Sequence, residues 1–251
     1  MTEDICVRTG AAVAGRCDGL LLINKPQGLT SHDVVLLARR RLGLARIGHA
    51  GTLDPMAQGL LLLLVGAATK QQAALQTHRK RYEAVIQLGT QTDTGDAWGQ
   101  PVQTKAIPVL EQSRVEGVLN AVVGPLTQTP PKFSAVKVQG RPLHWWARRG
   151  TPVSAPARTI TIFQTELLEW APERFRCRLD CSSGTYVRSV AEHLAEQLGT
   201  VGHVSELIRL TVGSWDLAQS HDVQWLSTAP REELLAALCP ITTSHAPADR
   251  P

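Results

Sequence analysis

The chain has 251 residues, of which 43% are hydrophobic, and it carries a formal net charge of +4 at pH 7. This size and apolar content suffice for a large folded body. The longest apolar run, Leu60 to Val65, is too short to cross a membrane, and no apolar leader follows the first methionine. We therefore expect a cytoplasmic protein without a membrane partner.

The sequence pattern in the first half of the chain predicts alternating strands and helices. Residues 1–17 lack periodicity and are expected to form a loose lead-in. Apolar runs and helical spacing then predict a strand over 19–24, a turn over 25–28, a helix over 31–42 with Ser31 at its N-cap, a strand over 60–65, a helix over 67–76 and a strand over 82–88.

The second half adds a hairpin and two helices. The expected elements are a helix over 108–123 opened by Pro108, paired strands over 159–170 and 174–181 that turn at 171–173, a helix over 187–198 stopped by Gly199, and a strand over 203–212. Residues 241–251 are expected to be a disordered tail. Because the order of strands and helices is irregular, we predict an α+β fold with a mixed, mainly antiparallel central sheet flanked by helices.

A single carboxylate, Asp54, stands in the glycine-rich stretch IGHAGTLDPMAQG, residues 47–59. Pro55 disfavours the helical conformation for Asp54, and the glycines permit tight turns, so the loop has a specific shape. An aspartate that only bonds the backbone of its own turn would give the same pattern. A structural and a chemical role both remain open at this point.

Basic residues concentrate in one segment. Between Gly117 and Thr165 there is no carboxylate, whereas six positive charges lie there, at Lys132, Lys137, Arg141, Arg148, Arg149 and Arg158. Such a local patch is typical of a surface that binds a polyanion, although a solvated basic face gives the same pattern. The two tyrosines, Tyr82 and Tyr186, stand near arginines and suit stacking on nucleobases, as they would suit ordinary packing in a sheet.

Several common kinds of site are excluded. The sequence has no phosphate-binding loop, dinucleotide fingerprint, serine-hydrolase elbow or zinc-protease motif, and neither its five cysteines nor its eight histidines have metal-ligand spacing. We expect reduced thiols and a site without metal or cofactor, built from an acid, an arginine, a histidine and tyrosines.

Six segments in fixed order carry a resemblance. They are LLINKPQGLTSHDVV, GHAGTLDPMAQGLLLLLVGAATK, KRYEAVIQLGTQTDTGDAWG, PPKFSAVKVQGRPL, CSSGTYVRSVAEHLAEQLG and HVSELIRL. Together they resemble the bacterial tRNA pseudouridine-55 synthases of the TruB type. The resemblance implies a pseudouridine synthase catalytic domain over 18–240 with a thumb insertion at about 128–158. It also implies an isomerase that flips a uridine out of the tRNA T-loop, breaks its N1–C1′ bond and rejoins the base through C5.

The resemblance also implies roles for individual residues. Asp54 corresponds to the catalytic aspartate, as nucleophile or general base, and Arg188 pairs with it and favours its charged form. Tyr82 stacks under the target base and assists removal of the C5 proton. The other residues implied to serve substrate binding are His49, Tyr186, Leu207 and Lys25 around the pocket, and Lys132, Lys137, Arg141, Arg148 and Arg149 in the thumb.

The implied partner is the tRNA T stem-loop, with neither a guide RNA nor an obligatory protein partner. Two alternatives stand beside it: a T-loop-binding folding chaperone with incidental catalysis, and a relative that acts on other RNAs with a guide RNA. The chain departs from the family at Trp98 and at residues 144–146, which are His-Trp-Trp. The segment after Leu210 resembles the linker before a C-terminal PUA-type domain, which is expected to be absent or truncated.

Overall fold

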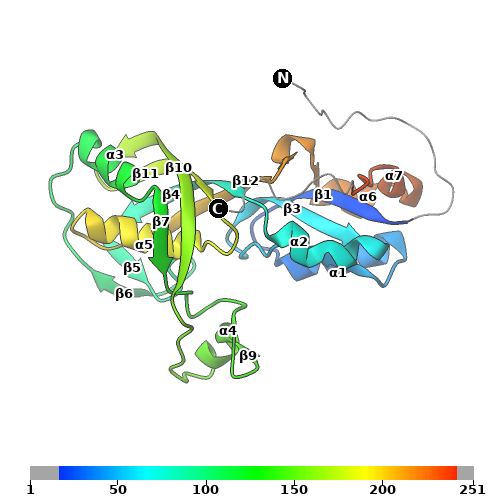
Figure 1. The fold of residues 1–251 in the computed structure, drawn as a ribbon, viewed down its shortest axis with the longest axis horizontal. Coiled ribbons are helices and arrows are strands. Elements are labelled where there is room, and N and C mark those ends of the chain that lie inside the picture. The colour runs from blue at the N-terminus through cyan, green and yellow to red at the C-terminus, as the bar shows by residue number, and fades with distance from the viewer. Residues whose placement is uncertain (1–16, 242–251) are drawn as a thin grey trace.

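The computed structural model describes residues 17–241 and shows one twisted sheet running through an elongated body (Figure 1). The expected lead-in and tail lie almost entirely outside the described residues. From one edge to the other the sheet consists of β14 (His221–Asp222), β1 (Gly19–Lys25), β3 (Gln58–Val65), β12 (Gly202–Val212), β4 (Lys80–Leu88), β11 (Arg174–Cys181), β10 (Arg158–Ala171) and β7 (Gly124–Gln128).

Two neighbouring pairs, β1 with β14 and β12 with β3, are parallel, and the other neighbours along this path are antiparallel. Two short strands, β2 (Ile47–His49) and β13 (Trp215–Asp216), join β3 and β12 from outside the path. The predicted α+β fold with a mixed, mainly antiparallel sheet is therefore confirmed.

The strand β3 is apolar along its whole length because both of its faces are covered. Leu61, Leu63 and Val65 belong to the main core, which includes the helix α1 (Ser31–Leu42). Leu60, Leu62 and Leu64 alternate with them and pack in a second cluster with Trp215. A strand buried on both faces reads as a continuous apolar run rather than an alternating one.

The hairpin of β10 and β11 forms where the sequence predicts it, with Ala171 paired to Arg174 across Pro172 and Glu173. The helix α5 (Val187–Gln197) packs on β12 and is followed by Gly199 at φ 85°, which agrees with the predicted stop. A smaller helix, α3 (Gln112–Ala121), packs against β10.

Three predictions differ from the structure in local detail. The N-cap of α1 is Thr30, which forms a capping box with Asp33, whereas Ser31 is the first helical residue and its hydroxyl is used elsewhere. The segment after β3 is a 3-10 helix, η1 (Gly66–Gln71), that continues into the short α2 (Gln72–Gln76). Finally, α3 begins at Gln112 and not at Pro108, which lies in the irregular connection before it.

The basic segment leaves the sheet and returns to it at one place. Gln128, the last residue of β7, is paired with Arg158, the first residue of β10. The residues between them form an excursion that projects from the body in Figure 1 and contains β8 (Lys137–Val138), β9 (Arg141–Pro142) and α4 (Leu143–Ala147). We call residues 129–157 the thumb.

The chain after β12 packs back on its beginning. It forms η2 (Leu217–Gln219), β14, α6 (Val223–Thr228) and α7 (Arg231–Ala236), and both of these α-helices contact α1. The remaining pair of strands, β5 (Thr90–Thr92) and β6 (Pro101–Thr104), forms a separate hairpin beside β12. Among the described residues, no helix is long and apolar enough to span a bilayer.

Candidate active site

A cleft of about 290 Å³ is lined by residues from β4, β12, the Asp54 loop, the start of α5 and the base of the thumb. Five of the predicted site residues line it: Asp54, Tyr82, Tyr186, Arg188 and Leu207. Tyr82 comes from β4 and Leu207 from β12, while Tyr186 is the N-cap of α5. Residues separated by more than 100 positions therefore meet in one cleft.

An ion pair lies in this cleft. The Nε atom of Arg188 is 2.9 Å from Oδ2 of Asp54, and the side chain of Arg188 is 3% exposed whereas that of Asp54 is 32% exposed. The other nitrogens of Arg188 donate to the carbonyls of Thr94, at 2.6 Å, and Phe133, at 2.8 Å. A planar guanidinium with several fixed acceptors has little freedom to rotate, so it fixes the direction of the positive charge.

Burial opposes the charge of Asp54. Loss of solvent is the largest effect and raises the pKa of Asp54 above the usual 3.8, while Arg188 lowers it and the neighbouring Asp96 raises it. Arg188 lowers the pKa of Asp54, as expected, but burial has a larger and opposite effect on that pKa. The site therefore contains an acid that holds its proton more tightly than a surface aspartate and is less well solvated.

The loop that carries Asp54 is held on both sides of the carboxylate. The hydroxyl of Ser31 accepts from the amide of Leu53 at 2.9 Å and donates to its carbonyl at 3.1 Å. On the other side, the amide of Gly28 donates to the carbonyl of Pro55 at 2.9 Å. Among residues 17–241, we find no backbone amide that donates to the Asp54 carboxylate, so the carboxylate is not used to close its own turn.

Tyr82 is buried, and burial is the largest effect that raises the pKa of its hydroxyl. Tyr186 has a different neighbour, because the guanidinium of Arg158 lies over its ring with Cζ 4.9 Å from the centroid. Arg158 also donates to the carbonyl of Gly184 and lines the cleft. It belongs to the basic segment but is not among the predicted site residues.

Two predicted residues stand behind the cleft instead of lining it. Lys25 is fully buried, and its ammonium donates to the carbonyls of Pro26 and Leu29, both at 2.8 Å. Burial lowers the pKa of Lys25 to about 8, although Asp54 partly offsets this. His49, at the end of β2, is half-buried and its pKa is lowered, chiefly by loss of solvent. Lys25 therefore holds the turn that follows β1, and neither Lys25 nor His49 lines the cleft.

The predicted basic residues of the thumb are all exposed: Lys132, Lys137, Arg141, Arg148 and Arg149. Arg149 packs over the ring of Trp145, with Cζ 3.7 Å from its centroid, and Arg141 lies 5.3 Å from the same ring. The two tryptophans, Trp145 and Trp146, meet edge to face at 4.7 Å. The His-Trp-Trp departure therefore forms an ordered aromatic cluster that supports arginine side chains.

Sequence reasoning also missed Asp96 as a site residue. Its Oδ2 lies 3.7 Å from Nη1 of Arg188, and its Oδ1 accepts from the hydroxyl of Thr94 and the amide of Trp98. The spacing T-D-T-x-D could have indicated this second acid. Trp98 itself is 54% exposed, so its bulk is accommodated at the surface and the loop keeps its hydrogen bonds.

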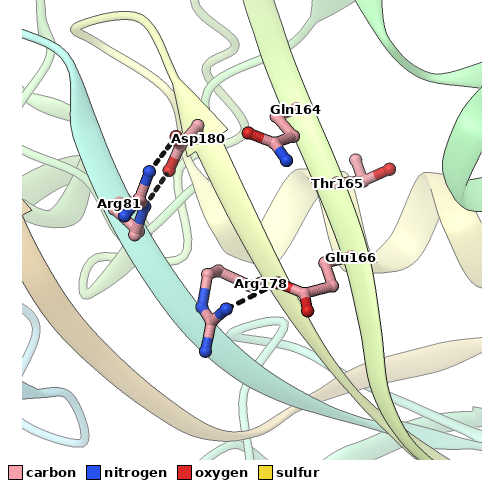
Figure 2. Close-up of a pocket in the computed structure, with 6 residues that line it drawn as sticks. All are labelled: Arg81, Gln164, Thr165, Glu166, Arg178 and Asp180. Atoms are coloured by element: carbon pink, nitrogen blue, oxygen red, sulfur yellow. Dashed lines mark hydrogen bonds and ion pairs between the residues drawn. The ribbon is translucent and has the colours of Figure 1, made fainter.

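A second hollow lies on the sheet face formed by β4, β10 and β11 (Figure 2). Its charges are already matched, because Arg81 pairs with Asp180 at 2.6 Å and Arg178 with Glu166 at 2.5 Å. Exposed pairs of this kind contribute little to stability and leave no charge for a ligand. Among the described residues, no group of three or more metal-ligating side chains occurs either here or in the cleft.

Comparisons with known proteins agree with this geometry. The N-terminal domain model of the TruB family pseudouridylate synthases matches residues 39–187. A tRNA pseudouridine synthase B of Aromatoleum aromaticum is 43% identical over 224 residues, covering 89% of this chain and 72% of that protein. One of Geobacillus thermodenitrificans is 42% identical over 208 residues, covering 80% and 69%.

Among solved structures, a chain of a Cbf5-Nop10-Gar1 complex superimposes with a TM-score of 0.67 at 27% identity. The alignment covers 88% of the present chain and 60% of that one. The fold and the cleft thus define a pseudouridine synthase, an isomerase that acts on a uridine. The chain belongs to the TruB family of pseudouridylate synthases.

Proposed function

We propose that this chain isomerises a uridine of the tRNA T-loop, at position 55, to pseudouridine. The observation that carries the proposal is the ion pair of Asp54 and Arg188 in a cleft that is also lined by Tyr82 and Leu207. The relatives named tRNA pseudouridine synthase B, which are more than 40% identical to this chain, support tRNA as the substrate.

The reaction rearranges bonds within one nucleotide. The N1–C1′ bond breaks, the uracil turns while it stays in the cleft, a C5–C1′ bond forms, C5 loses its proton and N1 gains one. Product and substrate are isomers, so the reaction consumes no co-reactant. Asp54 attacks as a nucleophile or removes a proton from the sugar as a base, and either role requires its ionised form.

Arg188 serves this step by orienting the carboxylate. Its guanidinium is fixed by the Thr94 and Phe133 carbonyls, so its Nε keeps one oxygen of Asp54 in place. The second oxygen of the carboxylate is left for the substrate. A preoriented, partly desolvated carboxylate needs less rearrangement at the moment of reaction than one in water.

Tyr82 supplies a stacking surface for the uracil. Because burial raises the pKa of its hydroxyl, the ring remains a neutral phenol at physiological pH, which is a poor base. This environment favours stacking and hydrogen bonding over removal of the C5 proton. Stacking on an aromatic ring contributes about 1–3 kcal/mol per base and offsets part of the cost of extruding the nucleotide.

The thumb supplies contacts to the RNA backbone. Its exposed cations, among them Lys137 and Arg148, stand on a segment whose base lines the cleft through Ser134 and Ala135. Such contacts position the RNA, while the shape of the loop and its unstacked bases provide selectivity. We propose that the enzyme works in the cytoplasm on the T stem-loop alone, without a guide RNA or a protein partner.

One experiment tests these statements together. The purified protein is incubated with an unmodified T stem-loop RNA, and pseudouridine is mapped in the RNA. The wild type should convert the target uridine without any other component, and Asp54→Asn should abolish conversion while it keeps most RNA binding. Asp180→Asn is the matched control, because it removes an aspartate paired with an arginine outside the cleft.

Conversion by Asp54→Asn at the wild-type rate would refute the role of this acid. RNA binding without conversion by the wild type would favour the folding chaperone. Conversion only after a guide RNA or another protein is added would refute the proposal that the enzyme acts alone.

A further inference from the structure

A second arginine, Arg209 on β12, lines the cleft and is only 1% exposed. Its Nε donates to the carbonyl of Leu60 at 2.7 Å. Its two terminal nitrogens donate to the carbonyls of Thr52, at 3.3 Å, and Gly51, at 3.1 Å. One guanidinium therefore binds three backbone oxygens of the segment that contains Asp54.

These three oxygens lie on both sides of Asp54 in the chain, two before it and one after it. Arg209 thus joins the two ends of the loop that carries Asp54. Ser31 and Gly28 hold the middle of the same loop through Leu53 and Pro55. Among the contacts of Ser31, Gly28 and Arg209 with this loop, only those of Arg209 come from β12. The same strand also carries Leu207, which lines the cleft.

Two glycines of the loop face Arg209, and one of them permits the close approach of β12. Gly59 has φ 104°, and a Cβ atom there would lie 2.3 Å from the carbonyl oxygen of Arg209. Gly51 has φ 102°, and a Cβ atom there would lie 3.5 Å from Nη1 of Arg209. Both conformations are strained for other residues. Gly59 therefore lets the end of the loop lie directly against the backbone of Arg209, and the left-handed turn at Gly51 favours glycine beside the guanidinium.

Arg209 is also connected to Tyr82. The two residues are register partners on neighbouring strands, and the pairing shifts immediately after them, between Arg209 and Thr211. An irregularity of this kind turns side chains relative to a regular ladder and is frequent next to active sites. The positive charge of Arg209 lowers the pKa of the Tyr82 hydroxyl, against the larger effect of burial.

The charge of Arg209 acts on other groups near the cleft. Burial lowers the pKa of Lys80 to about 8, and Arg209 is the next largest cause. For His49 the order is the same, with burial first and Arg209 second. Arg209 therefore places a positive charge beside both of these groups.

We propose that Arg209 is a positioning residue, which fixes the backbone of the Asp54 loop and the Tyr82 ring in the arrangement that the isomerisation requires. This inference rests on the proposed function. Lysine cannot substitute for it, because an ammonium is a point charge on a flexible stem and cannot reach three carbonyls that a planar fork reaches at once. The role therefore depends on the shape of the guanidinium and not on its charge alone.

Arg209→Lys separates these contributions. The rate of pseudouridine formation in a single turnover, at saturating enzyme, should fall by about 10–100-fold, because small displacements of reacting groups cost that much. The dissociation constant for the T stem-loop should change by less than about 3-fold, since Arg209 is 1% exposed and its nitrogens are bound to backbone carbonyls. Arg41→Lys is the matched control, because it removes one guanidinium–carbonyl hydrogen bond, to Ala229 at 2.8 Å, outside the cleft.

Hydrogen exchange gives a readout that does not depend on the RNA. In Arg209→Lys the amides of residues 50–57 should exchange faster than in the wild type, whereas those of α1 and of the β10–β11 hairpin should not change. Gly51→Ala, which leaves Arg209 in place and disturbs one of its three hydrogen bonds, should give the same pattern and serves if Arg209→Lys does not fold.

The proposal is overturned if Arg209→Lys keeps the wild-type rate, or if exchange rises equally throughout the sheet and the rate falls only with the folded fraction. If the wild type does not modify the T stem-loop, the proposed function fails, and exchange in the 50–57 loop still decides whether Arg209 fixes it. If the wild type is active and loop exchange is unchanged in both variants, the positioning role alone fails.

Discussion

Arg188 binds Asp54 and the base of the thumb with the same guanidinium. Its Nε lies 2.9 Å from the Asp54 carboxylate, and its Nη2 donates to the carbonyl of Phe133 at 2.8 Å. Phe133 is followed by Ser134 and Ala135, which line the cleft. The base of the thumb and the acid are therefore joined through a single side chain.

The hydrogen bonds of Arg188 predict a large effect of Arg188→Lys. A lysine cannot serve Asp54, Thr94 and Phe133 together, so we expect the single-turnover rate of pseudouridine formation to fall by about 100-fold or more. Arg178→Lys is the control, because Arg178 pairs with Glu83 and Glu166 outside the cleft. Its rate should stay within about 2-fold of the wild type. Equal rates in the two variants would contradict this role of Arg188.

The environment of Asp54 predicts the pH dependence. Burial raises the pKa of Asp54 above the usual 3.8, although Arg188 lowers it. The reactive form is ionised, so the single-turnover rate should fall as the pH drops through this raised pKa. The folded state holds this proton more tightly than the unfolded chain, so protonation of Asp54 contributes stability as the pH falls through the raised pKa.

As the pH falls through this pKa, protonation of Asp54 should therefore lower the rate of the reaction but increase the stability of the folded state. Rates and circular dichroism should be followed together from pH 8 downwards. We expect the rate to decline, with an apparent pKa above 3.8, while the fold persists. If the rate instead stayed constant until the protein unfolded, this prediction would be wrong.

Two adjacent residues separate loop positioning from helix stability. Ser31→Ala removes both hydrogen bonds to Leu53, next to Asp54, and should lower the free energy of unfolding by about 2 kcal/mol. Its single-turnover rate should fall by about 10-fold, because the loop loses its central support. Thr30→Ala removes only the cap of α1 and should cost about 1 kcal/mol.

For Thr30→Ala the rate should stay near that of the wild type once the folded fraction is taken into account. Urea unfolding and single-turnover assays on the two variants measure both quantities. If the two substitutions reduced the rate equally, the support of Leu53 by Ser31 would have no specific importance for the reaction.

The exposed thumb cations predict the salt dependence of RNA binding. The double variant Lys137→Gln, Arg148→Gln should weaken binding of the T stem-loop and reduce the slope of log affinity against log salt by about 1 for each phosphate that is no longer neutralised. At saturating enzyme the rate should change little. Arg174→Gln, at the far tip of the β10–β11 hairpin, removes an exposed charge away from the thumb and should leave the slope unchanged.

Local patterns were enough for the long strands and for the main helices that pack on them. The leucine run of β3, the β10–β11 hairpin around Pro172 and the end of α5 at Gly199 depend on propensities and periodicities of neighbouring residues. The segments that meet in the cleft could also be predicted from the sequence, but this prediction depended on the resemblance to a known family and not on residue spacing alone. The start of α1 was harder to predict, because Thr30 and Ser31 are both good N-cap residues. The hydroxyl of Ser31 binds the backbone of Leu53, so Thr30 forms the cap.

Tertiary structure alone decided how the Asp54 loop is held. Arg209 binds Thr52 across 157 positions of sequence, and Arg188 binds Thr94 across 94 positions. No local period encodes such hydrogen bonds, because the directions of two distant side chains are set only when the sheet brings them together. The sequence by itself determined that an isolated acid stands in a shaped loop, and its family resemblance implied Arg188 as the partner of that acid. Folding determined that Arg209 holds the loop and that Thr94 and Phe133 hold Arg188.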